Sequence, residues 1–298
     1  MLNSRPFYDL CIQDSYFNKD NFQKNLKALY NYGYKTIAIN QSIDDSDVEP
    51  KKKKKKGEPR EPQDAVPVPF DLTKIEELVN KLEFGGFTIL NRLTVSFASL
   101  DTLYKITKSP NFKKYHIVAA APTTPQALTH TCSTFEADIF TFNPENKFNL
   151  RLNRKLYNQL IDRGYHFELQ YAPAILDSTK RKNLIHAANL FHLFGKSKNI
   201  IISSGADNVN YLRGPYDIIN LGLIFGLSEL QCKTAITHCA KKTVINSVGR
   251  RHGKAVMFVE NVEKSPEETK RDSYMEMIED SDDDITVVDQ PKSKKTKT

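Results

Sequence analysis

The chain has 298 residues, of which 39% are hydrophobic, a low share for one continuous fold. Two polar segments account for the deficit: residues 45–69, rich in Pro, Lys and acidic residues, and residues 261–298. The remaining residues, roughly 235, suit one large α/β barrel or two ordinary domains. No apolar run approaches the roughly 18–20 residues of a membrane span, and no signal-like stretch opens the chain, so we expect a soluble intracellular protein.

Charge is distributed unevenly along the chain. The formal net charge is +7, and residues 261–298 contain an excess of acidic residues, so the rest of the chain is more basic than the total suggests. A basic body favours a polyanionic partner such as nucleic acid, because phosphate neutralisation releases counterions. A solvated basic surface without such a partner is the alternative.

The cysteines predict no covalent framework. Cys11, Cys132, Cys232 and Cys239 form no CxxC pair and no zinc-finger spacing, so we expect buried, reduced thiols, as in cytosol or nucleus.

The first elements in chain order have a β-α-β pattern. Residues 7–11 and 36–40 are apolar runs typical of strands, and Phe22, Leu26, Leu29 and Tyr30 recur between them at helical spacing. After the polar insertion, Thr73 and Glu76 predict a capping box for a further helix, which ends at Gly85 and Gly86.

The alternation continues through the rest of the chain. Strands are predicted at 88–94, 116–120, 138–142, 166–171 and 199–203, with helices at 124–134, around Leu152, Leu156 and Leu160, and at 178–195. Pro215 predicts the first turn of a helix that ends near Gly226. Ser228 and Gln231 predict the cap of a last helical stretch with Ala235, Ile236 and Ala240. An eighth strand is expected within 207–213.

Seven or eight β-α units imply parallel strands and match a TIM-type barrel. A doubly wound open sheet is the competing architecture, but its glycine-rich fingerprint is missing after Cys11. We therefore predict a barrel over residues 1–260, with 45–69 as a flexible insertion and 261–298 as an acidic, then basic, disordered tail.

Functional groups of such a barrel gather where the strands end. We expect a polar network at this mouth, made by Asp9, Asn40, Glu168, Ser203 and Ser204. Charged residues inside strands carry a large desolvation cost unless they are paired. Asp9, Arg92 and Glu168 therefore predict either an internal ion-pair network or, with Arg92, a phosphate-binding group at the mouth.

A catalytic metal site is not indicated. The first strand carries Asp9-Leu10-Cys11 where a metal-dependent hydrolase commonly has an H-x-H pair, and His116 and His166 open their strands. We predict no metal, no cofactor and no catalytic residue in this chain.

Two charged runs lie outside the predicted barrel. Lys51, Lys52, Lys53, Lys54, Lys55 and Lys56 form either a nuclear-localisation signal or a solvated loop. The acidic run 279–284 surrounds Ser281, which we expect to be a target for an acidophilic kinase.

Several strings, in this order, together resemble one family. They are Tyr8-Asp9-Leu10, Ile37-Ala38-Ile39-Asn40, Arg92-Leu93-Thr94, Asp162-Arg163-Gly164, Phe167-Glu168-Leu169, Tyr171-Ala172-Pro173-Ala174-Ile175, Asp177-Ser178-Thr179, Ile201-Ile202-Ser203-Ser204-Gly205-Ala206, Arg213-Gly214-Pro215-Tyr216-Asp217, Asn220-Leu221-Gly222 and Phe225-Gly226-Leu227-Ser228. Over residues 6–250 the chain resembles the TIM-barrel protein subunit of eukaryotic ribonuclease P and ribonuclease MRP.

The resemblance implies a barrel related to the metal-dependent PHP phosphoesterases but without their metal ligands. It implies that the RNA subunit is the catalyst, in a nucleolar particle that trims precursor tRNA at its 5′ end and takes part in rRNA processing. The chain would then be a non-catalytic subunit that holds this RNA and other protein subunits, including the small ferredoxin-like one. The alternative is a stand-alone PHP-type phosphoesterase.

We expect RNA or partner contacts at Arg92, at Lys180, Arg181 and Lys182, and at Arg213. The last two sites precede or open helices after predicted strands, near the C-terminal rim, where backbone N–H groups also favour phosphate. Alternatively, Arg213 pairs with Asp217, and the three-base cluster faces a protein subunit.

Overall fold

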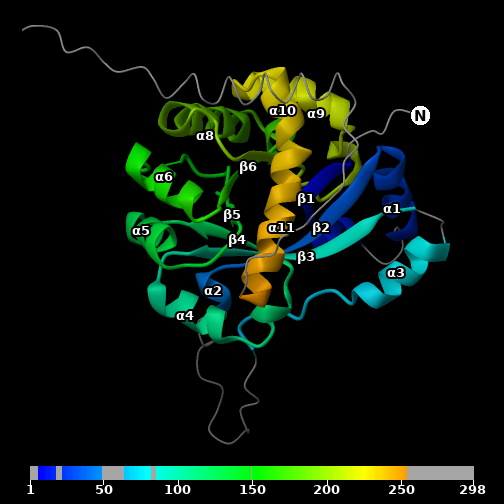
Figure 1. Cartoon of the computed structure of the whole chain (residues 1–298), viewed down its shortest axis with the longest axis horizontal. Helices are drawn as coiled ribbons and strands as arrows, with labels where there is room; N and C mark the ends of the chain where they lie inside the picture. The colour runs from blue at the N-terminus through cyan, green and yellow to red at the C-terminus, as the bar shows by residue number, and fades with distance from the viewer. Residues whose placement is uncertain (1–5, 18–21, 49–63, 82–84, 149, 254–298) are drawn as a thin grey trace, which may run out of the picture. The chain divides into compact units, whose positions relative to one another are not determined.

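The computed structural model describes residues 6–17, 22–48, 64–81, 85–148 and 150–253 (Figure 1). These residues belong to a compact unit that spans Met1–Val256, and a second unit, Met257–Thr298, lies outside the described residues. No helix among the described residues is long and apolar enough to cross a bilayer.

Seven parallel strands lie in sequential order and form the wall of a barrel. Seven of the eight strands that the sequence predicts are confirmed: β1 (Phe7–Gln13), β2 (Tyr34–Ile43), β3 (Thr88–Phe97), β4 (Ile117–Pro122), β5 (Ile139–Phe140), β6 (His166–Gln170) and β7 (Ile200–Ser203). The two-residue β5 is the shortest of them, and it still pairs with both neighbours.

The seven strands nearly close the barrel, and the described residues contain no eighth strand. Ile12 forms a parallel bridge with Ala206, and the Gly205 amide donates to the Cys11 carbonyl over 2.7 Å. The predicted strand at 207–213 is wrong, because this segment contains the 3-10 turn η3 (Val209–Tyr211). The Asn208 side chain caps that turn by accepting from the Asn210 amide, a local bond that competes with pairing in a sheet.

Most predicted helices are present: α1 (Phe22–Asn31), α3 (Leu72–Lys81), α5 (Pro125–Ser133), α6 (Arg154–Asp162), α8 (Ser178–Gly195), α9 (Pro215–Gly222) and α10 (Glu229–Ala235). The capping box of Ser228 and Gln231 is confirmed. The cap predicted at Thr73 is wrong, because α3 already starts at Leu72 and Asp71 accepts from the Thr73 amide.

The structure adds elements that the sequence patterns did not predict: α2 (Asp45–Val48), α4 (Leu100–Lys108), α7 (Ala172–Leu176), and the 3-10 turns η1 (Asp14–Phe17), η2 (Phe112–Lys114) and η4 (Leu223–Phe225). The last helical stretch is divided, because the chain breaks at Ile236 and Thr237 before α11 (His238–His252).

The ends of the polar insertion pack on the barrel. Asp45 in α2 accepts from the Ala98 amide over 2.7 Å, and Val66 is buried. The expectation that all of residues 45–69 lack a packed position is therefore wrong at both ends. The Lys51–Lys56 run and residues 261–298 lie outside the described residues.

Side chains alternate between the two faces of the barrel wall. Outward residues such as Leu93, Val118 and Phe167 join the large core under the surrounding helices, where Tyr157 stacks on Phe167 with ring centroids 3.9 Å apart. Inward residues form a second apolar cluster: Tyr8, Leu10, Ala38, Ile117, Ala119, Ile139 and Ile201, with Ala240 of α11. The gold helix α11 thus covers the end of the barrel where the strands begin (Figure 1).

Candidate functional site

Arg92 of β3 and Glu168 of β6 meet inside the barrel, and neither side chain is exposed to solvent. Arg92 Nη2 donates to Glu168 Oε2 over 2.6 Å, and Nη1 donates to the other carboxylate oxygen and to the Leu10 carbonyl. The sequence left two alternatives for Arg92, an internal ion pair and a phosphate-binding group. The geometry is that of the internal ion pair. It gives the Arg92 guanidinium no surface for an RNA phosphate.

Polar neighbours surround this ion pair. The Ser203 hydroxyl and the Gln170 amide both donate to Glu168. Burial acts to raise the pKa of Glu168, but Arg92 and these donors outweigh burial and hold that pKa below its usual value. Arg92 Nε donates to Thr94, whose hydroxyl donates to Asn40 over 2.6 Å. The structure therefore brings Asn40, Glu168 and Ser203 together with Arg92.

Asp9 and Ser204 lie at the junction that closes the barrel. Asp9 Oδ1 accepts from the Ser204 amide over 3.0 Å and from the Cys11 amide over 3.2 Å. Asp9 Oδ2 is buried without a hydrogen-bond partner among the described residues. Burial raises the pKa of Asp9 to about 6. These two residues connect β1 to the segment after β7, so their first role is structural.

His116 and His166 lie at the other end of the barrel, where their strands begin. His116 precedes β4 and accepts from the Asn91 amide at Nδ1, while His166 opens β6 and is fully buried. Desolvation lowers the pKa of each to about 4, so both are neutral at pH 7. Among the described residues, no group of three or more His, Cys, Asp or Glu side chains is placed to hold a metal ion.

The three-base cluster at the start of α8 lies on the C-terminal side of the barrel. Lys180 Nζ forms an ion pair with Glu145 at 2.8 Å, and Arg181 donates to the Ala174 carbonyl, while Lys182 is exposed. Asp177 caps α8 by accepting from the amides of residues 179 and 180. The Asp177 carboxylate thus already accepts from these two amides, and phosphate contact by the side chains of the cluster stays a prediction.

Arg213 lies in the segment between η3 and α9. Its carbonyl accepts from the Tyr34 hydroxyl, and its guanidinium donates to the carbonyls of Asn210 and Leu212. The following Tyr216 packs edge-on against Phe7, the first residue of β1. The Arg213 amide also donates to the hydroxyl of Tyr171, the residue that follows β6, over 3.0 Å, so the segment touches both the starts of β1 and β2 and the end of β6. RNA contact at Arg213 stays a prediction.

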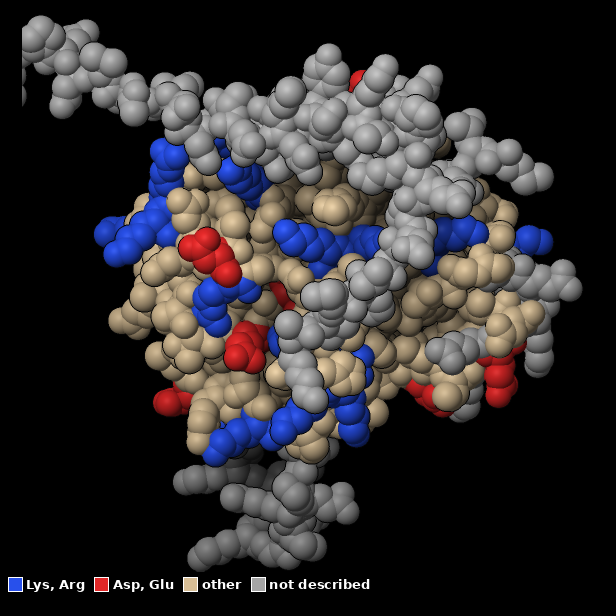
Figure 2. All heavy atoms as spheres, in the orientation of Figure 1, with Lys and Arg blue, Asp and Glu red and all other residues tan. Residues whose placement is uncertain are grey.

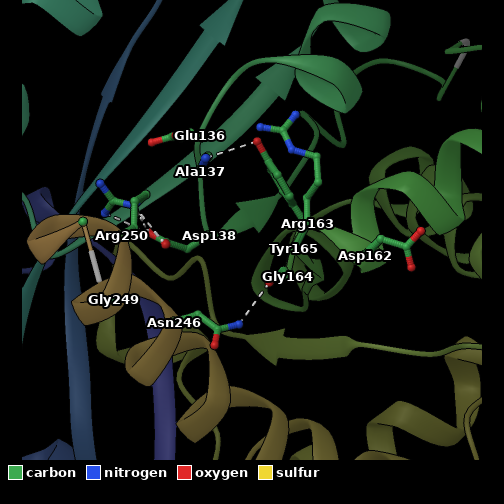
Figure 3. A pocket seen from close by; sticks show the side chains of 11 residues that line it. Glu136, Ala137, Asp138, Asp162, Arg163, Gly164, Tyr165, Asn246, Gly249 and Arg250 are labelled. Carbon is green, nitrogen blue, oxygen red and sulfur yellow. Dashed lines mark hydrogen bonds and ion pairs between the residues drawn. The ribbon is translucent and has the colours of Figure 1, made fainter. Parts of the chain in front are cut away.

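Sequence reasoning missed a second buried ion pair, at the N-terminal end of the barrel. Arg250 of α11 donates to both carboxylate oxygens of Asp138, which precedes β5, and to the His116 carbonyl. Burial raises the pKa of Asp138, and Arg250 opposes that shift. Nearby, Asn246 donates to the Gly164 carbonyl. Figure 3 shows both contacts beside a cleft of about 650 Å³.

The Arg250–Asp138 ion pair clamps α11 to the barrel. Two sequence features could have indicated this clamp: Asp138 precedes an apolar run, and Arg250 is followed by a second arginine. The clamp fixes the last turn of α11 against the beginnings of two strands, β4 and β5. The surface at the N-terminal end of the barrel contains two clefts, and Glu136 and Arg250 line both of them.

Comparisons with known proteins identify the family. The family model described as RNase P subunit p30 matches residues 6–252. The mouse ribonuclease P protein subunit p30 is 36% identical over 211 residues, which cover 70% of this chain and 74% of the mouse protein. The yeast ribonuclease P/MRP protein subunit RPP1 from Saccharomyces cerevisiae is 25% identical, and the match covers 82% of this chain and 79% of the yeast protein.

Other relatives differ in length or in sequence. Arabidopsis thaliana protein GAMETOPHYTE DEFECTIVE 1 is 32% identical, but the match spans 57% of this chain and only 30% of the plant protein. A chain in the cryo-EM structure of archaeal ribonuclease P with mature tRNA shares the fold, with a TM-score of 0.60 at 15% identity over 87% of this chain and 99% of that chain. Because the family model matches most of the chain and the mouse relative is 36% identical, the chain belongs to the ribonuclease P subunit p30 family.

Proposed function

We propose that the chain is a non-catalytic, RNA-binding subunit of ribonuclease P, and also of ribonuclease MRP. The observation that carries this proposal is the family match, which spans the barrel. The barrel interior supports it, because the polar positions that would serve a barrel enzyme are used by the Arg92–Glu168 pair and its neighbours. A stand-alone PHP-type phosphoesterase is the weaker candidate.

In this proposal the partners are the ribonuclease P RNA, the MRP RNA and other protein subunits, including the small ferredoxin-like one. Precursor tRNA is the substrate of the whole particle, and rRNA processing is the further task of the MRP form. A nuclear and nucleolar location goes with these partners, with Lys51–Lys56 as the candidate import signal. The names of the mouse and yeast relatives support the particle assignment.

We also propose that the barrel is the folding unit. Residues 49–63 and 261–298 carry no periodic apolar face, whereas Val66 is buried and belongs to the barrel. A chain without these two segments is expected to show a cooperative thermal melt. A molten or insoluble product would contradict this division.

The test of the function compares the chain alone with the assembled particle. The purified chain is assayed on a small phosphoester and on precursor tRNA, with and without Mg²⁺ or Mn²⁺, and then with the RNA and the other subunits added. We expect no cleavage by the chain alone and 5′ processing only after assembly. Metal-dependent hydrolysis by the chain alone would favour the phosphoesterase.

A further inference from the structure

A second cleft, of about 580 Å³, opens at the N-terminal end of the barrel beside the last turn of α11. Its walls come from α4, η2, the end of α5 and the end of α11, and its lining includes Leu100, Tyr104, Phe112, Lys113, Phe135 and Arg251. Nothing in the family match or in the polar network of the barrel interior assigns a role to this cleft.

The apolar side of the cleft presents an aromatic ring to solvent. Tyr104 is 60% exposed and Leu100 is 46% exposed, whereas Phe112 and Phe135 are buried. Lys108 Nζ lies 4.2 Å from the centroid of the Tyr104 ring, so a cation already accompanies this ring. An exposed aromatic side chain with a cation beside it is a surface on which a nucleobase stacks.

The polar side of the cleft is mostly cationic. Lys113 and Arg251 are exposed, and Arg250 is held by Asp138 and the His116 carbonyl. Glu136 is the one acidic residue among the side chains that line the cleft. The sequence of α11 contains no Asp or Glu. Figure 2 shows Lys and Arg side chains along the same lower edge of the molecule, over the region of α4 and the end of α11.

We infer that this cleft binds an unpaired nucleotide of RNA, with the base against Tyr104 and the adjoining phosphates on Lys113 and Arg251. The inference rests on the proposed RNA-binding function and names a place for it. Arg250 acts as a positioning residue, because its clamp on Asp138 fixes the helix turn that carries Arg251. An acidic peptide of a partner subunit would use the cations, but it does not require a large exposed ring beside them.

The test uses the full chain and a fluorescently labelled single-stranded oligouridylate, with binding followed by anisotropy at several salt concentrations. Tyr104→Ala is expected to weaken binding roughly tenfold, because one base loses its stacking partner. Tyr104→Phe keeps the ring and is expected to retain most of the affinity. Arg251→Gln is expected to make the salt dependence shallower by about one unit of slope.

Arg154→Gln is the charge-matched control, since Arg154 is exposed at the start of α6 and lines neither cleft. The control is expected to leave the salt slope at the wild-type value. Circular dichroism checks that each variant folds, which we expect because Tyr104 and Arg251 are exposed.

Three outcomes would overturn the inference, and they are distinguishable. If wild-type protein binds RNA and Tyr104→Ala binds equally well, the cleft is not the site while the proposed function stands. If wild-type protein binds neither the oligouridylate nor the ribonuclease P RNA, the proposed function fails with it. In the assembled particle, crosslinks from Lys113 to a protein subunit in place of RNA would assign the cleft to a peptide.

Discussion

The two ends of the barrel use buried charge in different ways. Toward the C-terminal end, Arg92 and Glu168 face each other across the interior, and both side chains are fully buried. At the N-terminal end, the Arg250–Asp138 pair is 14% and 2% exposed and joins a surface helix to the barrel wall. The first pair fills a space inside the barrel, whereas the second builds a surface between two clefts.

The two ends of the barrel therefore differ in which groups are available for binding. A TIM-barrel enzyme places its reactive groups where the strands end. Here several of those groups, among them Arg92, Glu168 and Ser203, are bonded to one another, which supports a structural task for them. The exposed aromatic and cationic side chains beside α11 lie at the opposite end, which in barrel enzymes usually serves stability.

The largest expected effect comes from breaking the interior pair. Arg92→Met leaves the Glu168 carboxylate buried without its cation, so we expect the free energy of unfolding to fall by about 3–5 kcal/mol. The double variant Arg92→Met with Glu168→Leu removes both charges and is expected to recover much of that loss. Urea unfolding measures both. A single variant as stable as wild type would show that the pair is not the element that fills the interior.

Acid should act mainly on the N-terminal end. The pKa of His166 is about 4 in the fold against an ordinary value of 6.5, so the unfolded chain binds more protons below pH 6.5. Stability is therefore full above pH 6.5 and falls as the pH drops toward 4, by up to roughly 3 kcal/mol from His166. His116 adds to this loss in the same direction.

Asp9 opposes that trend, because its pKa is raised from 3.8 to about 6. Its contribution is fully present below pH 3.8 and is lost as the pH rises through 6. Unfolding measured from pH 7 to pH 4.5 should thus show a shallower acid loss in His166→Leu and a steeper one in Asp9→Asn. The exposed His252→Gln serves as the control. A wild-type profile in His166→Leu would contradict the assignment.

The clamp of α11 should cost less to break than the interior pair, because Arg250 is partly exposed and water can replace some of its bonds. We expect Arg250→Ala to lower the free energy of unfolding by roughly 2 kcal/mol, the scale of hydrogen bonds to a charged group. Hydrogen exchange should rise in the last turn of α11 and stay unchanged in α8. Equal changes in both helices would mean that Arg250 supports the whole barrel.

Local patterns were sufficient for the strands and for most helices. Apolar runs identified all seven strands, and the Ser228–Gln231 signal identified the start of α10. The sequence of α4 also carries a helical stripe, Leu100, Leu103 and Ile106, so that helix could have been found. The prediction of an eighth strand was wrong because Asn208 caps a local turn, and an apolar pattern does not reveal that hydrogen bond.

Long-range contacts explain what local patterns could not predict at the site. The Arg213 carbonyl accepts a hydrogen bond from Tyr34, 179 residues away along the chain, and Arg250 donates to Asp138, 112 residues away. The choice between an internal pair and a phosphate site at Arg92 also depended on Glu168, which lies on a different strand. Such pairings become visible only when the register of the barrel is known.

The smallest expected effect on stability is at the C-terminal rim, where the sequence placed the RNA contacts. Lys180 and Glu145 form an exposed pair, at 31% and 61% exposure, so Lys180→Gln should change the free energy of unfolding by well under about 1 kcal/mol. RNA binding distinguishes the two ends of the barrel more sharply than stability does. If Lys180, Arg181 and Lys182 contact phosphates, neutralising Arg181 and Lys182 should lower the salt slope of RNA binding by about two units, one for each lost contact. If the slope falls only for Arg251→Gln and not for these variants, the RNA surface lies at the N-terminal end, and the cluster on α8 is left as a solvated or protein-facing surface.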